Sequence, residues 1–277
     1  PSFLMLKQNM IMKTKLLIMA TLAVACAFAF LGCDVNKNAN GIKAFSVDKE
    51  KQVIFSKGNL QYHPLNNEWR FAPNQTDYIG DANSNIALDY DGWVDLFCWG
   101  TGANPTNVSN DYNDYQIFTD WGRNEIEGNM MGTWRTLTSD EWIYLLDRRK
   151  NAKNLKGIAQ VNGVNGLIIL PDNWKTPQGI IFKPSFHHEQ SIEAYRLYQT
   201  LTAEQWSILE QSGAVFLPAA VSRIGNVVDS TSTYGHYWTS TINDDFSSYH
   251  FYLYSNEAGV GCCSPYVGMS VRLVKDL

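Results

Sequence analysis

Apolar and polar residues alternate with a period of two in several short stretches in the first third of the chain. Turn-forming residues separate the alternating pairs, which are Val53 and Phe55, Leu60 and Tyr62, and Trp69 and Phe71. Alternation puts every second side chain on the same face of a strand. The pattern therefore predicts short strands that pair as an antiparallel meander.

Two helices are predicted from capping boxes. Thr138 is followed three residues later by Glu141, Thr202 is followed by Gln205, and apolar residues come next at helical spacing. We expect the second helix to end at Gly213. A short apolar strand that ends in proline is predicted after each helix, at 167–171 and 214–218.

Residues 77–131 lack regular periodicity, yet large rings occur throughout this part of the chain and just beyond it: Trp93, Phe97, Trp99, Trp121 and Trp134. So many rings favour ordered loops that pack onto a small sheet. Further strands are predicted at 237–240, 249–254 and 270–274. Two helices, several short strands and abundant ordered loop indicate an α+β domain with small antiparallel sheets and long ordered loops.

The N-terminal residues have the pattern of a secretory signal peptide. Lys13 and Lys15 precede the apolar run 16–31, and Cys33 follows Gly32. This position of Cys33 resembles the lipobox of bacterial lipoproteins, in which the cysteine is lipidated. A transmembrane anchor is the alternative, but the run is short and has no stop-transfer flank.

These features divide the chain into parts. We expect a signal peptide at 1–32, with upstream read-through at 1–11, then a polar lipidated tether at 33–42 and one domain at 43–277. Removal of the signal peptide takes away three lysines and no acidic residue, so the formal net charge falls from −5 to −8. This acidic balance argues against nucleic acid as a partner, because phosphate binding needs a basic face.

The remaining cysteines predict neither a disulfide framework nor a metal cluster. Cys98, Cys262 and Cys263 are an odd number, and no CxxC pair or Cys/His cluster at ligand spacing occurs. Cys98 stands between two aromatic residues, so we expect a small buried thiol there.

Other candidate chemistry is weak. His187 and His188 would point to opposite faces of one strand, and Asn243–Asp245 lacks the spaced oxygen ligands of a calcium site. No nucleophile elbow, phosphate loop or dinucleotide motif is present. The sequence therefore predicts no catalysis, no cofactor and no metal.

A resemblance covers nearly all of the chain after the tether. Its motifs resemble those of a family of Bacteroidales lipoproteins and occur at Phe55–Tyr62, Trp69–Phe71, Asp77–Gly80, Gly92–Phe97, Trp99–Thr101, Leu137–Trp142, Leu170–Trp174, Gly213–Ala219, Tyr237–Thr241 and Ser270–Val274. Such proteins are similar to C-type-lectin-fold domains, in the branch shared with formylglycine-generating enzymes and the variable proteins of diversity-generating retroelements. The resemblance implies a C-type-lectin-like fold whose final segment forms part of an exposed binding face.

The strand predicted at 249–254 has two different faces. His250, Tyr252 and Tyr254 would form a polar-aromatic surface, while Phe251 and Leu253 would lie in the core. An ordinary half-exposed strand is the alternative interpretation.

The composition of residues 242–268 suits a diversified segment. Retroelement diversification randomises the first two positions of asparagine-type codons, and the resulting codons cannot encode Lys, Glu, Gln, Met or Trp. Glu257 is the one residue of this segment that such codons do not encode. Residues 259–268 have no periodicity and are predicted to form an exposed loop. The expected invariant frame is Tyr237, Trp238, Ser240, Ser270, Val271 and Arg272. Within the candidate variable region 236–268, the expected ligand contacts are His236, Ile242, Asp244, Asp245, Phe246, Ser248, His250, Tyr252, Tyr254, Cys262, Cys263, Ser264, Tyr266 and Val267.

These observations predict a non-catalytic lipoprotein of the outer membrane that faces the cell surface. It would touch the membrane only through the lipid on Cys33 and would bind a protein or glycan on another cell, a phage or a host. One alternative is a fimbria- or adhesion-associated structural lipoprotein without diversification. The other is an oxidase of the formylglycine-generating type, although such enzymes use separated cysteines whereas Cys262 and Cys263 are adjacent.

Overall fold

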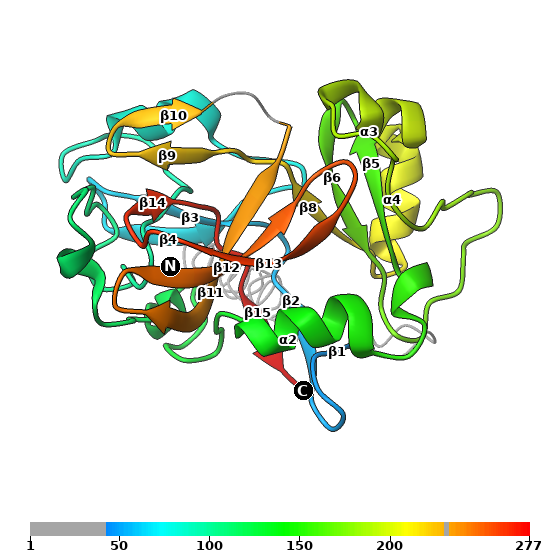
Figure 1. Ribbon diagram of the computed structural model, residues 1–277, viewed down its shortest axis with the longest axis horizontal. Helices are drawn as coiled ribbons and strands as arrows, with labels where there is room; N and C mark the ends of the chain where they lie inside the picture. The colour runs from blue at the N-terminus through cyan, green and yellow to red at the C-terminus, as the bar shows by residue number, and fades with distance from the viewer. Residues whose placement is uncertain (1–42, 230–232) are drawn as a thin grey trace, which may run out of the picture. The chain divides into compact units, whose positions relative to one another are not determined.

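The computed structural model describes residues 43–229 and 233–277 and has a mixed α+β architecture with few helices and several small sheets (Figure 1). Residues Lys43–Leu277 form one compact unit. The predicted signal peptide, Cys33 and the tether lie outside the described residues. Within the described ranges, no helix combines the length and the apolar character needed to span a membrane.

The strands of the described residues form five small sheets, with the orders β1-β2-β15, β3-β4, β7-β5-β6-β8, β10-β9-β14 and β11-β12-β13. Most neighbouring strands are antiparallel, and β5 and β7 are parallel. The strands are β1 (Phe45–Ser46), β2 (Gln52–Phe55), β3 (Leu60–His63), β4 (Glu68–Phe71), β5 (Lys156–Val161), β6 (Val164–Ile169), β7 (Thr200–Leu201), β8 (Val215–Pro218), β9 (Ser222–Ile224), β10 (Val227–Asp229), β11 (Gly235–Asp244), β12 (Ser247–Leu253), β13 (Ala258–Cys263), β14 (Val267–Gly268) and β15 (Val274–Asp276).

The α-helices of the described residues are α2 (Ser139–Ile143), α3 (Ile192–Tyr198) and α4 (Ala203–Gln211). Helix α2 continues as one π-helical turn, η4 (Tyr144–Arg148). Short 3-10 turns are η1 (Gly80–Asn85), η2 (Tyr112–Tyr115), η3 (Trp121–Arg123) and η5 (Ala152–Asn154). Helix α2 lies against β12 and β13, and α3 and α4 lie beside the β7-β5-β6-β8 sheet (Figure 1).

Both predicted capping boxes are confirmed. The Thr138 and Thr202 hydroxyls each accept a hydrogen bond of 3.2 Å from the backbone N–H three residues on. Helix α4 ends two residues before Gly213, whose φ of +99° favours glycine. The expectation of two helices is wrong, because α3 begins after Ser191. That serine caps the helix without a Glu or Gln at the third position, so its sequence signal is weaker.

The predicted meander is also wrong. β3 and β4 form a hairpin, but β2 pairs with β1 and β15 and not with β3. The period of two shows that a strand has one buried face and does not say which core receives it. Val53 packs into the cluster around α2, whereas the apolar residues of β3 and β4 pack into a second cluster.

The expectation of ordered loops packed onto a small sheet is confirmed. Phe97, Trp99 and Trp121 are buried in the second cluster beside the β3–β4 hairpin. Trp99 Nε1 donates to the Thr239 carbonyl at 2.9 Å, so a loop ring is fixed to β11. The rings therefore order a part of the chain that has little regular structure.

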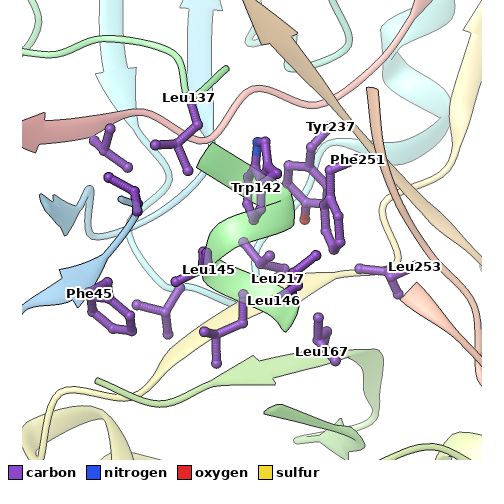
Figure 2. Packing of buried hydrophobic residues seen from close by; sticks show 14 of the residues in the cluster. Phe45, Leu137, Trp142, Leu145, Leu146, Leu167, Leu217, Tyr237, Phe251 and Leu253 are labelled. Carbon is purple, nitrogen blue, oxygen red and sulfur yellow. The ribbon is translucent and has the colours of Figure 1, made fainter. Parts of the chain in front are cut away.

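The cluster around α2 joins the helix to the C-terminal strands. The rings of Trp142 and Phe251 stack with their centroids 4.4 Å apart and an angle of 8° between their planes (Figure 2). Leu145, Leu217 and Leu253 pack around this pair. The inner side of β12 is thereby fixed to the helix.

The segment Ser270–Val274 is not the regular strand that its alternation predicts, since β15 begins at Val274. All five of its residues are buried, at 1% exposure or less. Val271 and Leu273 belong to the second cluster and Val274 to the cluster around α2. The segment lies between the two clusters. Its apolar residues are therefore buried on all sides and do not mark one face of a strand.

Loss of the stacked pair should destabilise the domain strongly. We expect Trp142→Ala to lower the free energy of unfolding by about 3–5 kcal/mol, because it removes a fully buried ring and leaves a cavity. Urea denaturation followed by circular dichroism measures this change. Leu197→Ala is the control: its side chain is 65% exposed, and a loss of less than about 0.5 kcal/mol is expected. Equal losses in the two variants would contradict the packing described here.

Candidate functional site

The candidate site lies on the antiparallel sheet of β11, β12 and β13, here called the C-terminal sheet. Its register pairs His236 with Tyr252 and Tyr252 with Gly259. A second row of cross-strand neighbours consists of Trp238, His250 and Gly261. The prediction of an exposed loop at 259–268 is therefore wrong for its first half, which belongs to β13. Two glycines and adjacent cysteines carry little strand signal, and pairing with β12 supplies what local propensity lacks.

The inner face of the C-terminal sheet is buried, as predicted for Phe251 and Leu253. Both side chains are 0% exposed and lie with Tyr237 in the cluster around α2. Ala258 and Val260 of β13 pack against the same cluster. This face therefore acts as a fixed support.

The outer face carries a group of five rings, here called the aromatic patch: Tyr234, His236, His250, Tyr252 and Tyr254. Ring centroids are 5.1 Å apart for Tyr234 and His236, 5.0 Å for His236 and His250, and 5.4 Å for Tyr252 and Tyr254. His250 is 7% exposed, and the other four rings are half-buried. Half-buried rings supply contact area at low entropy cost, which suits recognition.

Glycines on β13 make room for these rings. A Cβ atom at Gly259 would lie 2.9 Å from the Tyr252 hydroxyl, and one at Gly261 would lie 3.5 Å from both His250 and Tyr252. A larger residue at Gly259 would push the Tyr252 ring away from its place. The glycines that weakened the strand prediction thus shape the outer face.

The two imidazoles of the patch are uncharged at neutral pH. Burial lowers the pKa of His236 to about 4, partly offset by the charge of Asp229. Burial and the neighbouring His236 lower the pKa of His250 to about 3. Among the described residues, the Nδ1 atoms of both rings are buried without a hydrogen-bond partner, and such groups cost stability.

A loop from the middle of the chain borders the aromatic patch. Ser255 follows Tyr254, and its carbonyl accepts a hydrogen bond of 2.8 Å from the His187 N–H. Its hydroxyl donates to the Glu189 carbonyl at 2.9 Å and accepts from the Ser191 N–H at 3.0 Å. The loop at 187–191 is therefore fixed beside the end of β12.

The prediction that His187 and His188 lie on a strand and point apart is wrong. Their backbone is irregular, and their rings stack with centroids 4.2 Å apart. Ligand atoms of His187, His188 and Glu189 lie within 4.8 Å of one another. However, the His188 and Glu189 side chains are 78% and 71% exposed, and exposed acidic groups are common in proteins without a metal ion.

A second group of predicted contacts lies at the tip of the β11–β12 hairpin. Ile242, Asp244, Asp245 and Phe246 are exposed there. The Asp244 carboxylate accepts hydrogen bonds from the Phe246 N–H at 2.9 Å and the Ser247 hydroxyl at 2.8 Å, which lower its pKa. Because these bonds close the turn, Asp244 has a structural role at the tip.

A third group surrounds the end of β13. Cys262 is exposed, while Cys263, Ser264, Tyr266 and Val267 are half-buried. Cys263 packs against the second cluster, and burial raises the pKa of its thiol to about 12. Adjacent strand residues point to opposite faces, so the two thiols are not arranged as a reacting pair.

Two of the predicted contacts are corrected by the structure. Ser248 and His250 are 1% and 7% exposed, so neither offers an open surface. The prediction assigned the outer face of β12 to solvent along its full length. Instead, Trp238 belongs to the second cluster and Cys263 packs against it. The outer face is therefore buried at this end of β12. The free part begins at Tyr252 and His236.

The predicted contacts do not form a single surface. Tyr252 and Ser248 are four residues apart on one strand, which corresponds to about 13 Å, and the hairpin tip lies beyond Ser248. The aromatic patch and the tip are thus separate ends of one sheet. Sequence analysis missed Tyr234 as a member of the patch, although its position two residues before His236 puts it on the same side of the chain.

The predicted frame is buried except for Ser240, which is half-buried. Tyr237, Trp238, Ser270, Val271 and Arg272 are each at most 1% exposed. Cys98 is also a buried thiol, as predicted, and burial raises its pKa.

No known family, curated protein or solved structure matches this chain.

The two faces of β12 should respond differently to truncation. We expect Phe251→Ala to lower the free energy of unfolding by about 3–5 kcal/mol because it empties the support under the sheet. The double variant Tyr252→Ala/Tyr254→Ala should lose only about 1–2 kcal/mol, since both rings are half-buried. Urea denaturation of the variants compares them directly. A larger loss in the double variant would mean that the patch belongs to the core.

The histidine pair should make the domain sensitive to acid. Below the ordinary pKa of about 6.5, the unfolded chain binds protons that the folded protein excludes from His236 and His250 until about pH 4 and 3. Their contribution to stability is therefore complete above pH 6.5 and is lost as the pH falls.

Urea denaturation at pH 7 and pH 4.5 measures this effect. We expect the wild type to lose roughly 1–3 kcal/mol more between the two pH values than His236→Gln/His250→Gln does. Buried Asp95, with its pKa raised to about 6, acts in the opposite direction but is the same in both proteins. Identical losses would contradict the assignment.

Proposed function

We propose that this protein is a non-catalytic binding protein whose ligand contacts the outer side of the C-terminal sheet. The observation that carries this proposal is the contrast between the two faces. Phe251 and Leu253 are sealed against α2, while Tyr252 and Tyr254 on the other side remain partly open to solvent. Partly exposed rings on a rigid support suit a recognition surface.

The proposed fold is C-type-lectin-like. The mixed α+β architecture, the small sheets and the long packed loops support this proposal. So does the antiparallel pairing of β2 with β15, which joins the beginning of the domain to its end. The resemblance of the sequence motifs to Bacteroidales lipoproteins remains the reason for choosing this fold over other α+β arrangements.

We propose diversification for the exposed part of the region 236–268. Exposed residues at the hairpin tip and half-buried rings in the aromatic patch can change with little loss of stability. Lipid on Cys33 would anchor the protein in the outer membrane. The domain would then meet a protein or glycan of another cell, a phage or a host.

A second candidate function follows from the burial of Ser248 and His250. Random replacement at these positions would put unsuitable side chains into a packed interior. A sheet that tolerates less change fits an adhesion-associated structural lipoprotein without diversification. In that case the outer face would bind one constant partner.

Natural copies of the gene distinguish the two candidates. If the first proposal holds, changes in many isolates should concentrate at the exposed or half-buried positions His236, Ile242, Asp245, Phe246, Tyr252, Tyr254, Cys262, Cys263, Ser264, Tyr266 and Val267. The buried Tyr237, Trp238, Ser248, His250, Val271 and Arg272 should stay constant, because each substitution there costs packing energy. Sequencing of the gene from those isolates is the measurement. Changes spread evenly over 43–277 would contradict diversification and favour the adhesin.

A further inference from the structure

We propose that the aromatic patch binds a cationic ligand, namely the lysine or arginine side chains of a basic protein segment. The proposal rests on the proposed function and narrows its ligand to one chemical class. Three features support it: the sign of the charges on the sheet, the arrangement of the tyrosine rings, and the neutrality of the histidines beside them.

The sequence around the patch contains no positive side chain. Between Arg223 and Arg272 there is neither lysine nor arginine, and the same stretch holds four acidic residues: Asp229, Asp244, Asp245 and Glu257. All of the C-terminal sheet lies within this stretch. The side chains of the sheet itself can thus contribute only negative formal charge to an approaching partner.

Carboxylates lie close to the rings. The Tyr254 N–H donates to the Glu257 carbonyl at 2.8 Å, so a tight turn brings Glu257 back beside the patch. Burial raises the pKa of the Tyr252 and Tyr254 hydroxyls, and the exposed Glu257 carboxylate raises both further. Asp147 of η4 acts on Tyr252 in the same direction, and this carboxylate also pairs with Lys156 at 2.7 Å.

The rings themselves suit a cation. The face of a tyrosine ring carries negative electrostatic potential and attracts an ammonium or guanidinium group within about 6 Å of its centre. Tyr234 and Tyr254 are half-buried with centroids 6.0 Å apart, and Tyr252 adjoins Tyr254. A long lysine or arginine side chain could lie along these rings while its charged end faces Glu257.

The histidines leave this negative character intact. Since the pKa values of His236 and His250 are lowered to about 4 and 3, neither ring adds positive charge at neutral pH. His250 contacts both His236 and Tyr252, with centroids 5.0 Å and 6.3 Å apart. The pair thus forms an uncharged part of the patch beside the tyrosines. The C-terminal sheet itself therefore offers no positive side chain to an anionic glycan or a nucleic acid.

Binding of short peptides tests the proposal. Fluorescently labelled octa-arginine is titrated into the purified full-length protein at low ionic strength, with octaglutamate and a neutral Gly-Ser octapeptide as comparison probes. We expect octa-arginine to bind more tightly than either comparison peptide. The affinity should fall as salt is added, because exposed charges are screened.

Variants locate the binding. Tyr252→Ala/Tyr254→Ala should weaken octa-arginine binding roughly 5- to 30-fold, and Glu257→Gln roughly 2-fold. Tyr252→Phe/Tyr254→Phe keeps the ring faces and should bind within about 2-fold of the wild type. Tyr78→Ala and Glu50→Gln are matched controls, at a half-buried tyrosine and an exposed glutamate outside the patch, and should leave the affinity unchanged.

Three results would overturn the cationic ligand. They are failure of octa-arginine to bind, equal binding of octaglutamate or the neutral peptide, and equal weakening in the control variants. The Phe variant shows whether a loss in the Ala variant comes from missing rings or from misfolding. The proposed function is judged separately by the pattern of natural variation, so the failure of one idea is distinguishable from the failure of the other.

Discussion

Burial of the segment Ser270–Val274 is the constraint on which the rest of the structure depends. Arg272 is 1% exposed, and its guanidinium donates to the amide oxygens of Gln75 at 2.6 Å and Asn59 at 3.3 Å. Burial lowers the pKa of Arg272 to about 10, so the group remains charged at neutral pH and depends on these partners. Gln75 also accepts from the Phe216 N–H and donates to Glu210. One polar network therefore ties the last segment of the chain to the loop after β4, to β8 and to α4.

This network explains why the C-terminal sheet has one fixed face and one free face. The segment after β14 lies between two apolar clusters, and Ser270 pairs with Tyr237 of β11. Because β11 is held from this side and β12 is held by the stack of Phe251 on Trp142, the sheet cannot shift when its outer side chains change. Two buried imidazole nitrogens without partners among the described residues show that the outer face is not built for greatest stability.

Features that depend on neighbouring residues could be predicted from the sequence, and features that depend on distant ones could not. The capping boxes at Thr138 and Thr202 need only four residues each, and both are present. Of the two partners of β2, β1 is close in sequence, but β15 lies near the end of the chain, and no local pattern predicts that pairing. At the site, the alternation of apolar and polar residues correctly predicted that Phe251 and Leu253 lie on the buried face. It could not show that His250 is covered, because the cover comes from the β11 rings of His236 and Trp238.

The two ends of the C-terminal sheet differ in how much change each can accept. At the hairpin tip, Asn243 and Asp244 close the turn through specific hydrogen bonds to Ser247 and the Phe246 N–H. Replacement of either residue removes bonds that few other side chains can make. In the aromatic patch, Tyr252 and Tyr254 are held by ring contacts, which depend on size and shape more than on one donor or acceptor. The aromatic patch is therefore the part of the sheet where recognition can change with the least loss of structure. Within 236–268, fewer positions can change than the sequence predicts. Ser248 and His250 are buried, and Asp244 is needed to close the turn.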